Sequence, residues 1–398
     1  MKFKTVSNTL PSGFKAFGLS AGIKRSGKPD LALFFSESPC VTAAMMTANA
    51  FKAAPLVVSA RHLAASKARA LIANSGNANC MTGRRGLLDA QEMTACVARF
   101  LSLRKEEVLV ASTGIIGKPL PMDKIRGAVP GLVSSLSARG FSSAAKAVMT
   151  TDTFAKTAAL RAVIGGKTVT LWGVCKGAGM IAPRMKMATM LAFCFTDALI
   201  EKAAMKDALA QAVDDSFNAV TIDNCMSTND MVVVMANGCA GNRMIRKGSP
   251  EAVRFSRILR QVCVRLARMI VEDAEGATKF IEVRVSGAGT RALAKDLAFG
   301  VANSNLFKCA MFGSDPNWGR IAAALGATDS RLKQQDLRIK LNGVHVFNNG
   351  KPVPVKDRDL LKGRNVAVDI TVGRGSSCAT VYTSDLSYGY VRINADYN

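Results

Sequence analysis

Short runs in which apolar and polar residues alternate recur along the chain, and this period of two is typical of half-buried β-strands. Alternating or short continuous apolar runs predict strands at residues 14–23, 107–112, 157–164, 167–174, 188–195, 231–236, 280–286 and 343–347. The pair Gly165-Gly166 joins two of these runs and predicts a tight hairpin. After Asp329 the chain is predicted to be mostly strands, ending with residues 366–373, 378–384 and 388–395.

The segments between the strands predict helices. These helices are expected at residues 59–74, 86–103, 121–139, 199–217, 250–273 and 290–302. Pro250 lies at the start of the longest, where its missing N–H costs nothing. Because strands and helices alternate and hairpins are frequent, we expect a mixed α/β fold with two sheets rather than a plain parallel doubly wound sheet.

The size and apolar content of the chain allow two or three domains with large cores. It has 398 residues, of which 49% are hydrophobic, and no apolar run long enough to span a membrane. The first residues lack the apolar segment of a secretory signal, although their basic, serine-containing character leaves a transit peptide open. We expect a cytoplasmic protein without membrane association.

Cysteine and histidine usage argues against a metal site. The ten cysteines contain no Cys-x-x-Cys pair, and most lie in apolar runs, which predicts buried free thiols. The chain has only two histidines, His62 and His345, so a histidine-rich zinc site is excluded. Neither histidine lies beside a nucleophile motif, and both are predicted to be structural. We expect no metal and no cofactor.

The charge is strongly positive and its meaning is ambiguous. With 53 basic and 29 acidic residues, the formal net charge is +24, which suggests nucleic-acid binding. However, the basic residues are spread along the whole chain, and only 6% of residues are aromatic, so stacking platforms for bases are scarce. Small anions such as amino-acid carboxylates are an equally good explanation, and we expect no nucleic-acid partner.

One segment suggests a specific chemistry. Residues 174–193 (VCKGAGMIAPRMKMATMLAF) combine glycines, methionines and a proline, and then place Thr189 at the mouth of a strand. Threonine is a poor nucleophile unless a base takes its proton, and the α-amine exposed by cutting the Ala188–Thr189 bond titrates at about pH 8. The segment therefore suggests a self-cleaving, N-terminal threonine nucleophile; the alternative is a methionine-lined core loop.

Two further segments bear on this chemistry. Residues 111–119 (ASTGIIGKP) lead a strand into a glycine turn, where Thr113 and Gly114 could donate to an oxyanion or form an ordinary strand end. Residues 74–83 (NSGNANCMTG) are either polar site lining or a surface loop of Asx-turns. The glycines of residues 286–294 do not have the spacing of a nucleotide-binding loop.

Taken together, these segments resemble the ornithine acetyltransferase family, the self-processing glutamate N-acetyltransferases of the cyclic arginine pathway. The likeness covers nearly the whole chain, and its combination of motifs is highly specific. The motifs are SAGIKRSGKPDLALFFSE (20–37), NSGNANCMTG (74–83), STGIIG (112–117), TTDT (150–153), KGAGMIAP (176–183), ATMLAF (188–193), STND (227–230), EGATKF (275–280), SDPNWGRIAAALG (314–326) and INADY (393–397).

The resemblance implies a layered, two-domain α/β fold of the N-terminal-nucleophile type. After self-cleavage, residues 1–188 would form an α chain and residues 189–398 a β chain, assembled as α2β2. It also implies ping-pong acyl transfer in arginine biosynthesis: Thr189 takes the acetyl group of N2-acetylornithine and releases ornithine, and glutamate then leaves as N-acetylglutamate. Whether acetyl-CoA is a second donor, as in bifunctional members, stays open.

The resemblance also assigns roles to single residues. Thr113 and Gly114 match the oxyanion donors of the family, and Ala188–Thr189 matches the cleavage site. The substrate-binding positions are Thr153, Lys176, Thr189, Glu275 and Asn394. These roles are chemically reasonable, because a lysine can bind a substrate carboxylate and a glutamate can bind an ammonium.

The chain departs from the family pattern at three places. Two extra residues lie between Pro183 and Ala188, which questions the cleavage rate and the placing of Lys176. Residues 223–225 (DNC) replace a usual Asp-Gly-Asp, which we expect to alter a turn. The family has a Ser or Thr five positions after the residue matching Asn394; here Asn398 is the last residue, so that contact is expected to be lost or replaced by the terminal carboxylate.

Two alternatives to the acetyltransferase remain at this stage. A related N-terminal-nucleophile amidohydrolase or aminopeptidase would pass the acyl group to water instead of glutamate. A basic nucleic-acid-binding or scaffolding protein without activity would show salt-sensitive retention of DNA.

Overall fold

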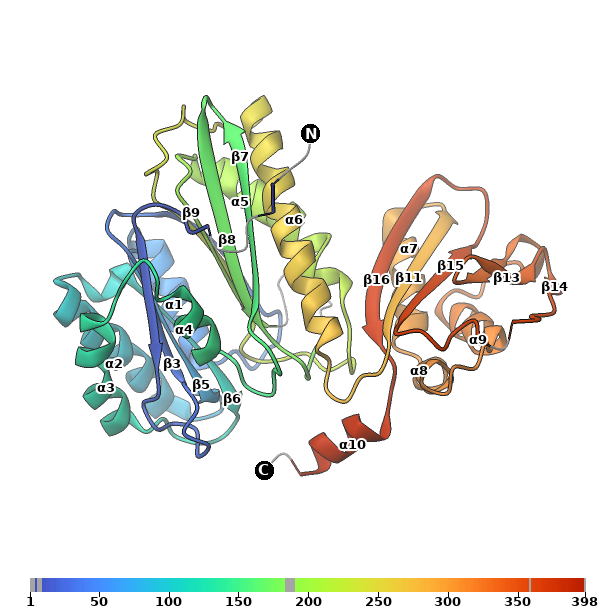
Figure 1. Cartoon of the computed structure of the whole chain (residues 1–398), viewed down its shortest axis with the longest axis horizontal. Helices are drawn as coiled ribbons and strands as arrows, with labels where there is room; N and C mark the ends of the chain where they lie inside the picture. The colour runs from blue at the N-terminus through green and yellow to red at the C-terminus, as the bar shows by residue number, and fades with distance from the viewer. Residues whose placement is uncertain (1–3, 6–8, 183–189, 358, 397–398) are drawn as a thin grey trace. The chain divides into compact units, whose positions relative to one another are not determined.

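The structure, a computed structural model, describes residues 4–5, 9–182, 190–357 and 359–396 (Figure 1). The chain forms two compact units. The first unit comprises residues 1–177, 183–218 and 226–270, and the second comprises residues 178–182, 219–225 and 271–398. In the part of the chain that is described, no helix is long and apolar enough to cross a membrane.

The first unit contains two sheets. The larger has the strand order β1 (Lys4–Thr5), β7 (Lys156–Ile164), β8 (Lys167–Lys176), β9 (Leu191–Thr196), β10 (Met231–Ala236) and β4 (Val41–Met46). The smaller has the order β2 (Phe14–Leu19), β3 (Leu31–Ser36), β5 (Ala70–Asn77) and β6 (Val108–Ile115). The pairs β9–β10 and β5–β6 are parallel and the other pairs antiparallel, so both sheets are mixed, as predicted.

The two sheets of the first unit enclose one apolar core. Aromatic rings from both sheets meet there; the ring centroids of Phe34 on β3 and Phe195 on β9 are 4.8 Å apart, and Trp172 on β8 packs against both. Burying such rings is a large favourable term in folding. The core therefore fixes the two sheets face to face.

Helices cover the outer faces of these sheets, which gives a layered unit (Figure 1). The helices of the first unit are α1 (Ala54–Ala65), α2 (Gly83–Leu101), α3 (Met122–Ser134), α4 (Phe141–Ala147), α5 (Lys202–Asp214) and α6 (Pro250–Glu272), with short 3-10 turns at Lys105–Glu107 and Phe217–Ala219. Helix α6 lies close to β8, because a Cβ added at Gly173 would be 3.0 Å from Leu266 Cδ1.

The second unit contains one sheet, so the described residues form three sheets rather than the two predicted. Its strand order is β14 (Lys351–Pro352), β13 (Val344–Asn348), β12 (Arg338–Leu341), β15 (Asn365–Thr371), β11 (Phe280–Ala288) and β16 (Ser377–Ser384). Its other elements are α7 (Arg291–Ala302), α8 (Asn305–Phe312), α9 (Trp318–Thr328), α10 (Tyr388–Ala395) and a 3-10 turn at Gln334–Asp336. Helices α7, α8 and α9 share one apolar core with the strands.

Most predicted strands and helices are confirmed, but residues 388–395 were wrongly predicted as a strand. They form the exposed helix α10, in which no residue is buried. The aromatic and β-branched residues Tyr388, Tyr390, Val391 and Ile393 favour a strand. The side chain of Ser387 decides otherwise, because its Oγ accepts a hydrogen bond from Tyr390 N at 3.2 Å and caps the helix.

The helix predicted at residues 59–74 is half wrong. Helix α1 ends at Ala65, and strand β5 begins at Ala70. Residues 70–74 lie between β3 and β6 and are all buried. A strand buried on both faces shows no alternation, so its apolar run cannot be told from a helix by periodicity.

The prediction of buried thiols is right for half of the cysteines. All ten lie within the described residues and are free; five are buried, Cys96 is half-buried, and Cys225, Cys239, Cys309 and Cys378 are exposed.

His62 is structural, as predicted: it is buried in α1 and its Nδ1 lies 2.8 Å from Val108 O. Among the described residues, no group of His, Cys, Asp and Glu could hold a metal ion.

A buried lysine in the second unit, Lys308, is expected to make the stability of the folded state depend on pH. Lys308 on α8 donates to Thr383 Oγ1 at 3.0 Å and to the carbonyl of Ser384. Burial lowers its pKa from 10.5 to about 8, and the nearby Asp385 and Asp223 only partly oppose this. The unfolded chain therefore holds this proton to higher pH than the folded protein, so the lysine's contribution makes the folded state more stable as pH rises between these values.

We expect the free energy of unfolding of the wild type, relative to Lys308→Met, to increase by roughly 2 kcal/mol between about pH 7.5 and 9.5. Denaturant titrations of both proteins at the two pH values measure the difference. The Lys308→Met variant isolates this group, because it removes the proton site and leaves the other titrating groups in place. Equal pH dependence in the two proteins would contradict the prediction.

Candidate active site

The predicted nucleophile and cleavage site, Thr189 and Ala188, lie outside the described residues, as do the two extra residues between Pro183 and Ala188. The chain directly after them is described. Met190 is buried, and its carbonyl oxygen accepts a hydrogen bond from Met231 N at 2.8 Å. The residue next to Thr189 is therefore fixed to strand β10.

Strand β9 starts in the middle of the six-stranded sheet. Its first residue, Leu191, pairs with Lys176 at the end of β8 and with Met231 at the start of β10. All six residues of β9 are buried. The predicted rigid strand after Thr189 is thus present, with the side chain of Lys176 at the end of the neighbouring strand.

Thr113 and Gly114, the predicted oxyanion donors, lie near the end of β6. Gly114 pairs with Gly76 on the parallel strand β5 and has a φ of +133°. A Cβ at Gly114 would lie 2.4 Å from Gly76 C and 2.5 Å from Asn77 N, both backbone atoms that cannot move aside. Only glycine fits here, so the two backbones approach closely at this strand end.

Lys176 contacts this strand end. Its Nζ donates to Thr113 Oγ1 at 3.2 Å, and its side chain is buried. Lys176 ends β8 and Thr113 lies near the end of β6, so two separate sheets contribute to the contact. The structure therefore brings two of the predicted site residues together.

A buried carboxylate stands beside Lys176. Asp152 accepts hydrogen bonds from Lys156 Nζ at 2.6 Å, Gly177 N at 2.8 Å and Thr150 N at 2.8 Å. Burial alone would raise the pKa of Asp152, but Lys176, Lys156 and the Gly177 N–H outweigh it and lower the pKa to about 2. Asp152 is therefore ionised at neutral pH and holds the end of β8 in place.

A third lysine completes this positive cluster. Lys24 Nζ donates to the carbonyl oxygens of Pro29 and Met149, both at 2.7 Å. Burial lowers its pKa to about 8, Asp30 and Asp152 oppose this, and Lys176 adds to it. Thr153, a predicted substrate-binding residue, follows Asp152 and is exposed.

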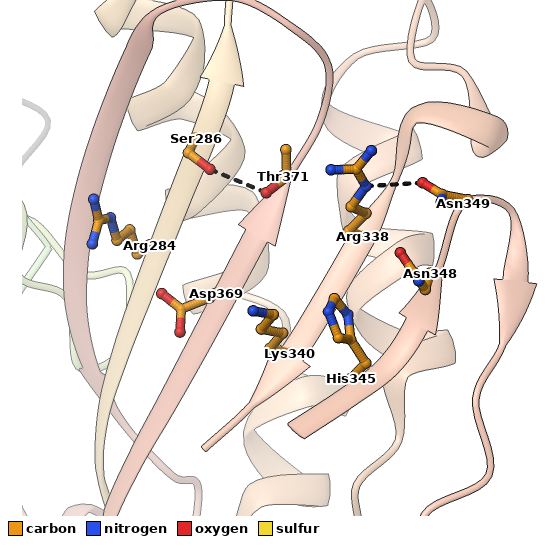
Figure 2. Close-up of a pocket in the computed structure, with 9 residues that line it drawn as sticks. All are labelled: Arg284, Ser286, Arg338, Lys340, His345, Asn348, Asn349, Asp369 and Thr371. Carbon is orange, nitrogen blue, oxygen red and sulfur yellow. Dashed lines mark hydrogen bonds between the residues drawn. The ribbon is translucent and has the colours of Figure 1, made fainter. Parts of the chain in front are cut away.

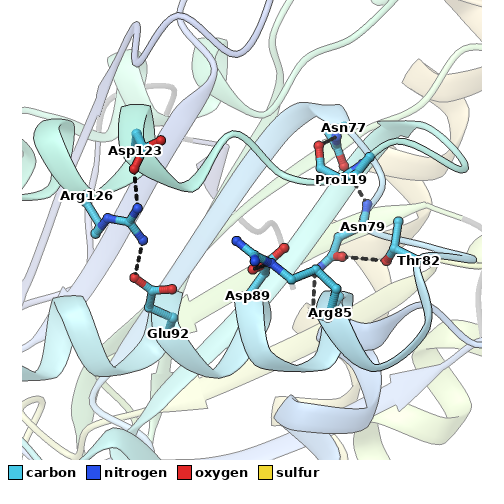
Figure 3. A network of polar contacts seen from close by, with 10 residues as sticks. Asn77, Asn79, Thr82, Arg85, Asp89, Glu92, Pro119, Asp123 and Arg126 are labelled. Atoms are coloured by element: carbon cyan, nitrogen blue, oxygen red, sulfur yellow. Dashed lines mark hydrogen bonds and ion pairs between the residues drawn. The ribbon is translucent and has the colours of Figure 1, made fainter.

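The amide-rich segment is mostly buried at residues 74–80 and exposed at Met81 and Gly83, and its amides belong to a network of polar contacts (Figure 3). Asn77 Nδ2 donates to Pro119 O at 3.0 Å, and Asn79 Nδ2 donates to Gly86 O at 2.9 Å. Asn74 Oδ1 accepts from Ser112 Oγ at 2.6 Å, directly before Thr113. These amides fix the backbone behind the Thr113–Gly114 turn.

The STND motif adds a second support and a buried acid. Asn229 Nδ2 donates to Ala78 O at 2.5 Å and Ser112 O at 2.8 Å, and so joins the segment before β10 to β5 and β6. Asp230 is buried directly before Met231, and its Oδ2 has no hydrogen-bond partner among the described residues. Burial raises the pKa of Asp230 well above its usual range.

Two predicted substrate-binding residues meet in the second unit. Glu275 is buried, and its Oε2 accepts a hydrogen bond from Asn394 Nδ2 on α10 at 2.9 Å. A Cβ at Gly179 would lie 2.2 Å from Glu275 Oε2, so this carboxylate touches the backbone of the glycine segment. The pairing of Glu275 with Asn394 joins residues 119 positions apart in the chain.

The turn at residues 223–225, where the sequence departs from the family pattern, contains a residue in the left-handed conformation. Asn224 stands where the family pattern has glycine and adopts a φ of +56°, which asparagine tolerates better than most residues. Asp223 accepts from Met180 N at 2.6 Å and Ile181 N at 2.9 Å. Tyr390 OH donates to the same carboxylate at 3.3 Å. Asp223 thus anchors the last described residues before the predicted cleavage site.

Sequence reasoning missed Lys24, Asp152, Asp223 and Asp230 as members of these clusters. All four lie in or next to motifs that were recognised, yet a motif does not tell which of its polar side chains are buried. For Asp230 the available signal is its position directly before a strand, where a buried acid needs charged or N–H partners.

Comparisons with known proteins identify the family of the chain. Residues 15–398 match the ArgJ family. The arginine biosynthesis bifunctional protein ArgJ of Geobacter sulfurreducens is 45% identical over 389 residues, 97% of this chain and 98% of that protein. The protein of the same name from Symbiobacterium thermophilum is 45% identical over 394 residues, 98% of each.

A solved structure is also similar in sequence. The crystal structure of ornithine acetyltransferase complexed with ornithine from Mycobacterium tuberculosis is 38% identical, with a TM-score of 0.42, and covers 46% of this chain and 98% of that one. The family assignment depends on the full-length matches. The chain belongs to the ArgJ family.

Proposed function

We propose that the protein is a glutamate N-acetyltransferase of arginine biosynthesis, which moves the acetyl group of N2-acetylornithine to glutamate. The observation that carries this proposal is the match to the ArgJ family over residues 15–398, with relatives 45% identical over nearly their whole length. This match favours acetyl transfer to glutamate over hydrolysis by a related N-terminal-nucleophile enzyme.

The proposed nucleophile is Thr189, freed by cleavage of the Ala188–Thr189 bond. Its Oγ attacks the acetyl carbonyl carbon, and its own α-amine takes the hydroxyl proton. The C–N bond to ornithine then breaks, the amine leaves with that proton, and an acetyl ester remains on Thr189. Glutamate reverses the sequence: its α-amine attacks the ester, loses a proton to the α-amine of Thr189, and leaves as N-acetylglutamate.

Residues of the first unit would bind the charges of the reaction. We assign Thr113 and Gly114 to the carbonyl oxygen, which becomes an oxyanion in each tetrahedral intermediate. Lys176 would bind a substrate carboxylate, and Thr153 would contact the substrate as in the family. The position of Lys176, buried within 3.2 Å of Thr113 Oγ1, supports both assignments, because it places a fixed positive charge beside the proposed oxyanion donors.

The proposed processing gives an α chain of residues 1–188 and a β chain of residues 189–398. Strands β9 and β10 belong to the second piece and pair with β8 and β4 of the first within one sheet. Separating the pieces would break these ladders and expose the aromatic core. The two pieces would therefore stay together after cleavage, and we further propose an α2β2 assembly.

A direct test mixes the purified protein with N2-acetylornithine and isotope-labelled glutamate. The proposal expects labelled N-acetylglutamate and ornithine in equal amounts, with little free acetate. Acetate formed in place of N-acetylglutamate would instead identify a hydrolase. Replacing acetylornithine with acetyl-CoA in the same assay determines whether the enzyme has the second, bifunctional donor activity.

The proposed role of Glu275 predicts different effects of its replacement on the two substrates. N2-acetylornithine carries a side-chain ammonium and glutamate does not, so Glu275→Gln should raise the KM for acetylornithine by about 10-fold and barely change the KM for glutamate. Steady-state kinetics of both half-reactions measure this split. Glu251→Gln, a partly exposed acid in the first turn of α6, is the matched control. Equal increases for both substrates would contradict the role.

A further inference from the structure

The sheet of the second unit has one polar face (Figure 2). Along β12 and β15 the residues alternate: Ile339, Leu341 and Val368 are buried in the core with α7, α8 and α9, while their neighbours point to the opposite side. Helices α7, α8 and α9 all pack on the apolar side of the sheet. Among the described residues of the second unit, the apolar core includes no helix on the polar side. Side chains there form a pocket of about 600 Å³.

Two cross-strand rows build this pocket. The first row, read from β11 through β15 and β12 to β13, is Arg284, Asp369, Lys340 and His345. The second row is Ser286, Thr371, Arg338 and Asn348, with Asn349 beside it. Directly opposite residues in a sheet have neighbouring Cβ atoms, so each row places its side chains in contact range.

The pocket has more cations and hydrogen-bond donors than anions. Arg284, Arg338 and Lys340 are opposed by the single carboxylate of Asp369. The nine lining residues also supply hydroxyl, amide and imidazole groups. The three cations lie on β11 and β12, which flank β15, and their excess positive charge favours an anionic ligand.

One contact within the pocket orients a cationic group, and polar atoms of the pocket keep hydrogen-bonding capacity. Arg338 Nε donates to Asn349 Oδ1 at 2.8 Å, which orients the guanidinium, and no other hydrogen bond of this side chain occurs among the described residues. Ser286 Oγ and Thr371 Oγ1 are 3.2 Å apart. Nδ1 of His345 is buried and has no partner among the described residues.

We propose that this pocket binds the phosphate group of a small molecule, either free phosphate or a phosphomonoester. A guanidinium matches two phosphate oxygens at once, and a lysine adds a compact charge. Arg338 and Lys340 occupy alternate positions of β12 and so lie on the same face of one strand. Thr371 lies directly opposite Arg338 and its hydroxyl can donate to a remaining phosphate oxygen, whereas Ser286 Oγ donates to the carbonyl oxygen of Ile370 at 3.2 Å.

A zwitterion such as an amino acid is the main competing ligand, and Asp369 distinguishes the two. This carboxylate pairs across the sheet with Arg284 and Lys340. It repels a phosphate but would bind the ammonium of a zwitterion. Asp369→Asn therefore has opposite effects on the two ligand classes.

The test is isothermal titration calorimetry of the full-length protein with inorganic phosphate at low ionic strength, where electrostatic binding is strongest. We expect saturable binding that Arg338→Gln and Lys340→Gln each weaken by about 10-fold or more. Asp369→Asn should tighten it. Lys351→Gln, an exposed lysine on β14 of the same sheet that does not line the pocket, removes the same charge and should leave it unchanged.

A second titration, with adenosine monophosphate, distinguishes a phosphomonoester ligand from free phosphate. Tighter binding than that of inorganic phosphate identifies a phosphomonoester ligand, and equal binding identifies free phosphate. Three results would overturn the proposal: no phosphate binding by the wild type, weaker binding in Asp369→Asn, or equal weakening by Lys351→Gln. Binding only of a DNA duplex, without competition by phosphate, would overturn it as well. Arg338→Lys is a second variant for the case that Arg338→Gln fails to fold. It keeps the positive charge and removes only the two-pronged contact between the guanidinium and phosphate.

Discussion

Replacing Thr189 by alanine is expected to leave the protein as one uncut chain and to lower acetyl transfer by roughly 10⁴-fold or more. The same hydroxyl is proposed to cut the Ala188–Thr189 bond and then to carry the acetyl group, so its loss removes both steps. Denaturing electrophoresis measures the cleavage, and the labelled-glutamate assay measures the transfer.

Two further variants make this test specific. Thr189→Ser keeps a hydroxyl and should still cleave and transfer, at reduced rates. Thr168→Ala changes an exposed threonine of β8 and should leave both activities unaltered. Full transfer by an uncut Thr189→Ala protein would rule out the proposed nucleophile.

Replacing Lys176 by methionine is expected to lower kcat/KM by about 100-fold or more, because the variant removes a buried charge beside Thr113. The variant should remain folded, since Asp152 keeps Lys156 as its partner. Steady-state kinetics and thermal unfolding measure the two effects separately.

Lys156→Met is the matched control for this prediction. Lys156 and Asp152 are both fully buried, and their charged atoms lie 2.6 Å apart. Removing one partner of such a pair costs about 3–5 kcal/mol, so this variant should lose stability first. If Lys176→Met lost stability but kept its kcat/KM, Lys176 would be structural instead.

The sequence predicted the individual parts of the first-unit site but not their contacts. The sequence motifs point to Thr113 and to Lys176, which are 63 residues apart. Their meeting depends on how β6 and β8, in two different sheets, face each other across the core. Periodicity gives no information on that pairing.

Buried charges were the least predictable feature. Asp152 lies in a recognised motif, TTDT, but only the structure shows it surrounded by Lys156, Lys176 and Gly177 N. At Asn224 the departure from the family pattern coincides with a left-handed backbone, which asparagine adopts more readily than most residues.

Helix α10 is the reverse case, because here the local structure was predicted wrongly. Its aromatic and β-branched residues predicted a strand, and the prediction failed because one capping contact from Ser387 outweighed the pattern in an exposed segment. The consequence reaches the candidate site, since α10 carries Asn394 to Glu275. The structure thus places Asn394, a predicted substrate-binding residue, beside Glu275, although the local structure around Asn394 was predicted wrongly.

The most direct test of the central claim is mass spectrometry of the enzyme incubated with N2-acetylornithine alone. The account predicts that ornithine is released and that the peptide beginning Thr-Met-Leu-Ala-Phe gains the mass of one acetyl group, which glutamate then removes. An enzyme that transfers acetyl groups while this peptide stays unmodified, or carries the acetyl group on another residue, would contradict it.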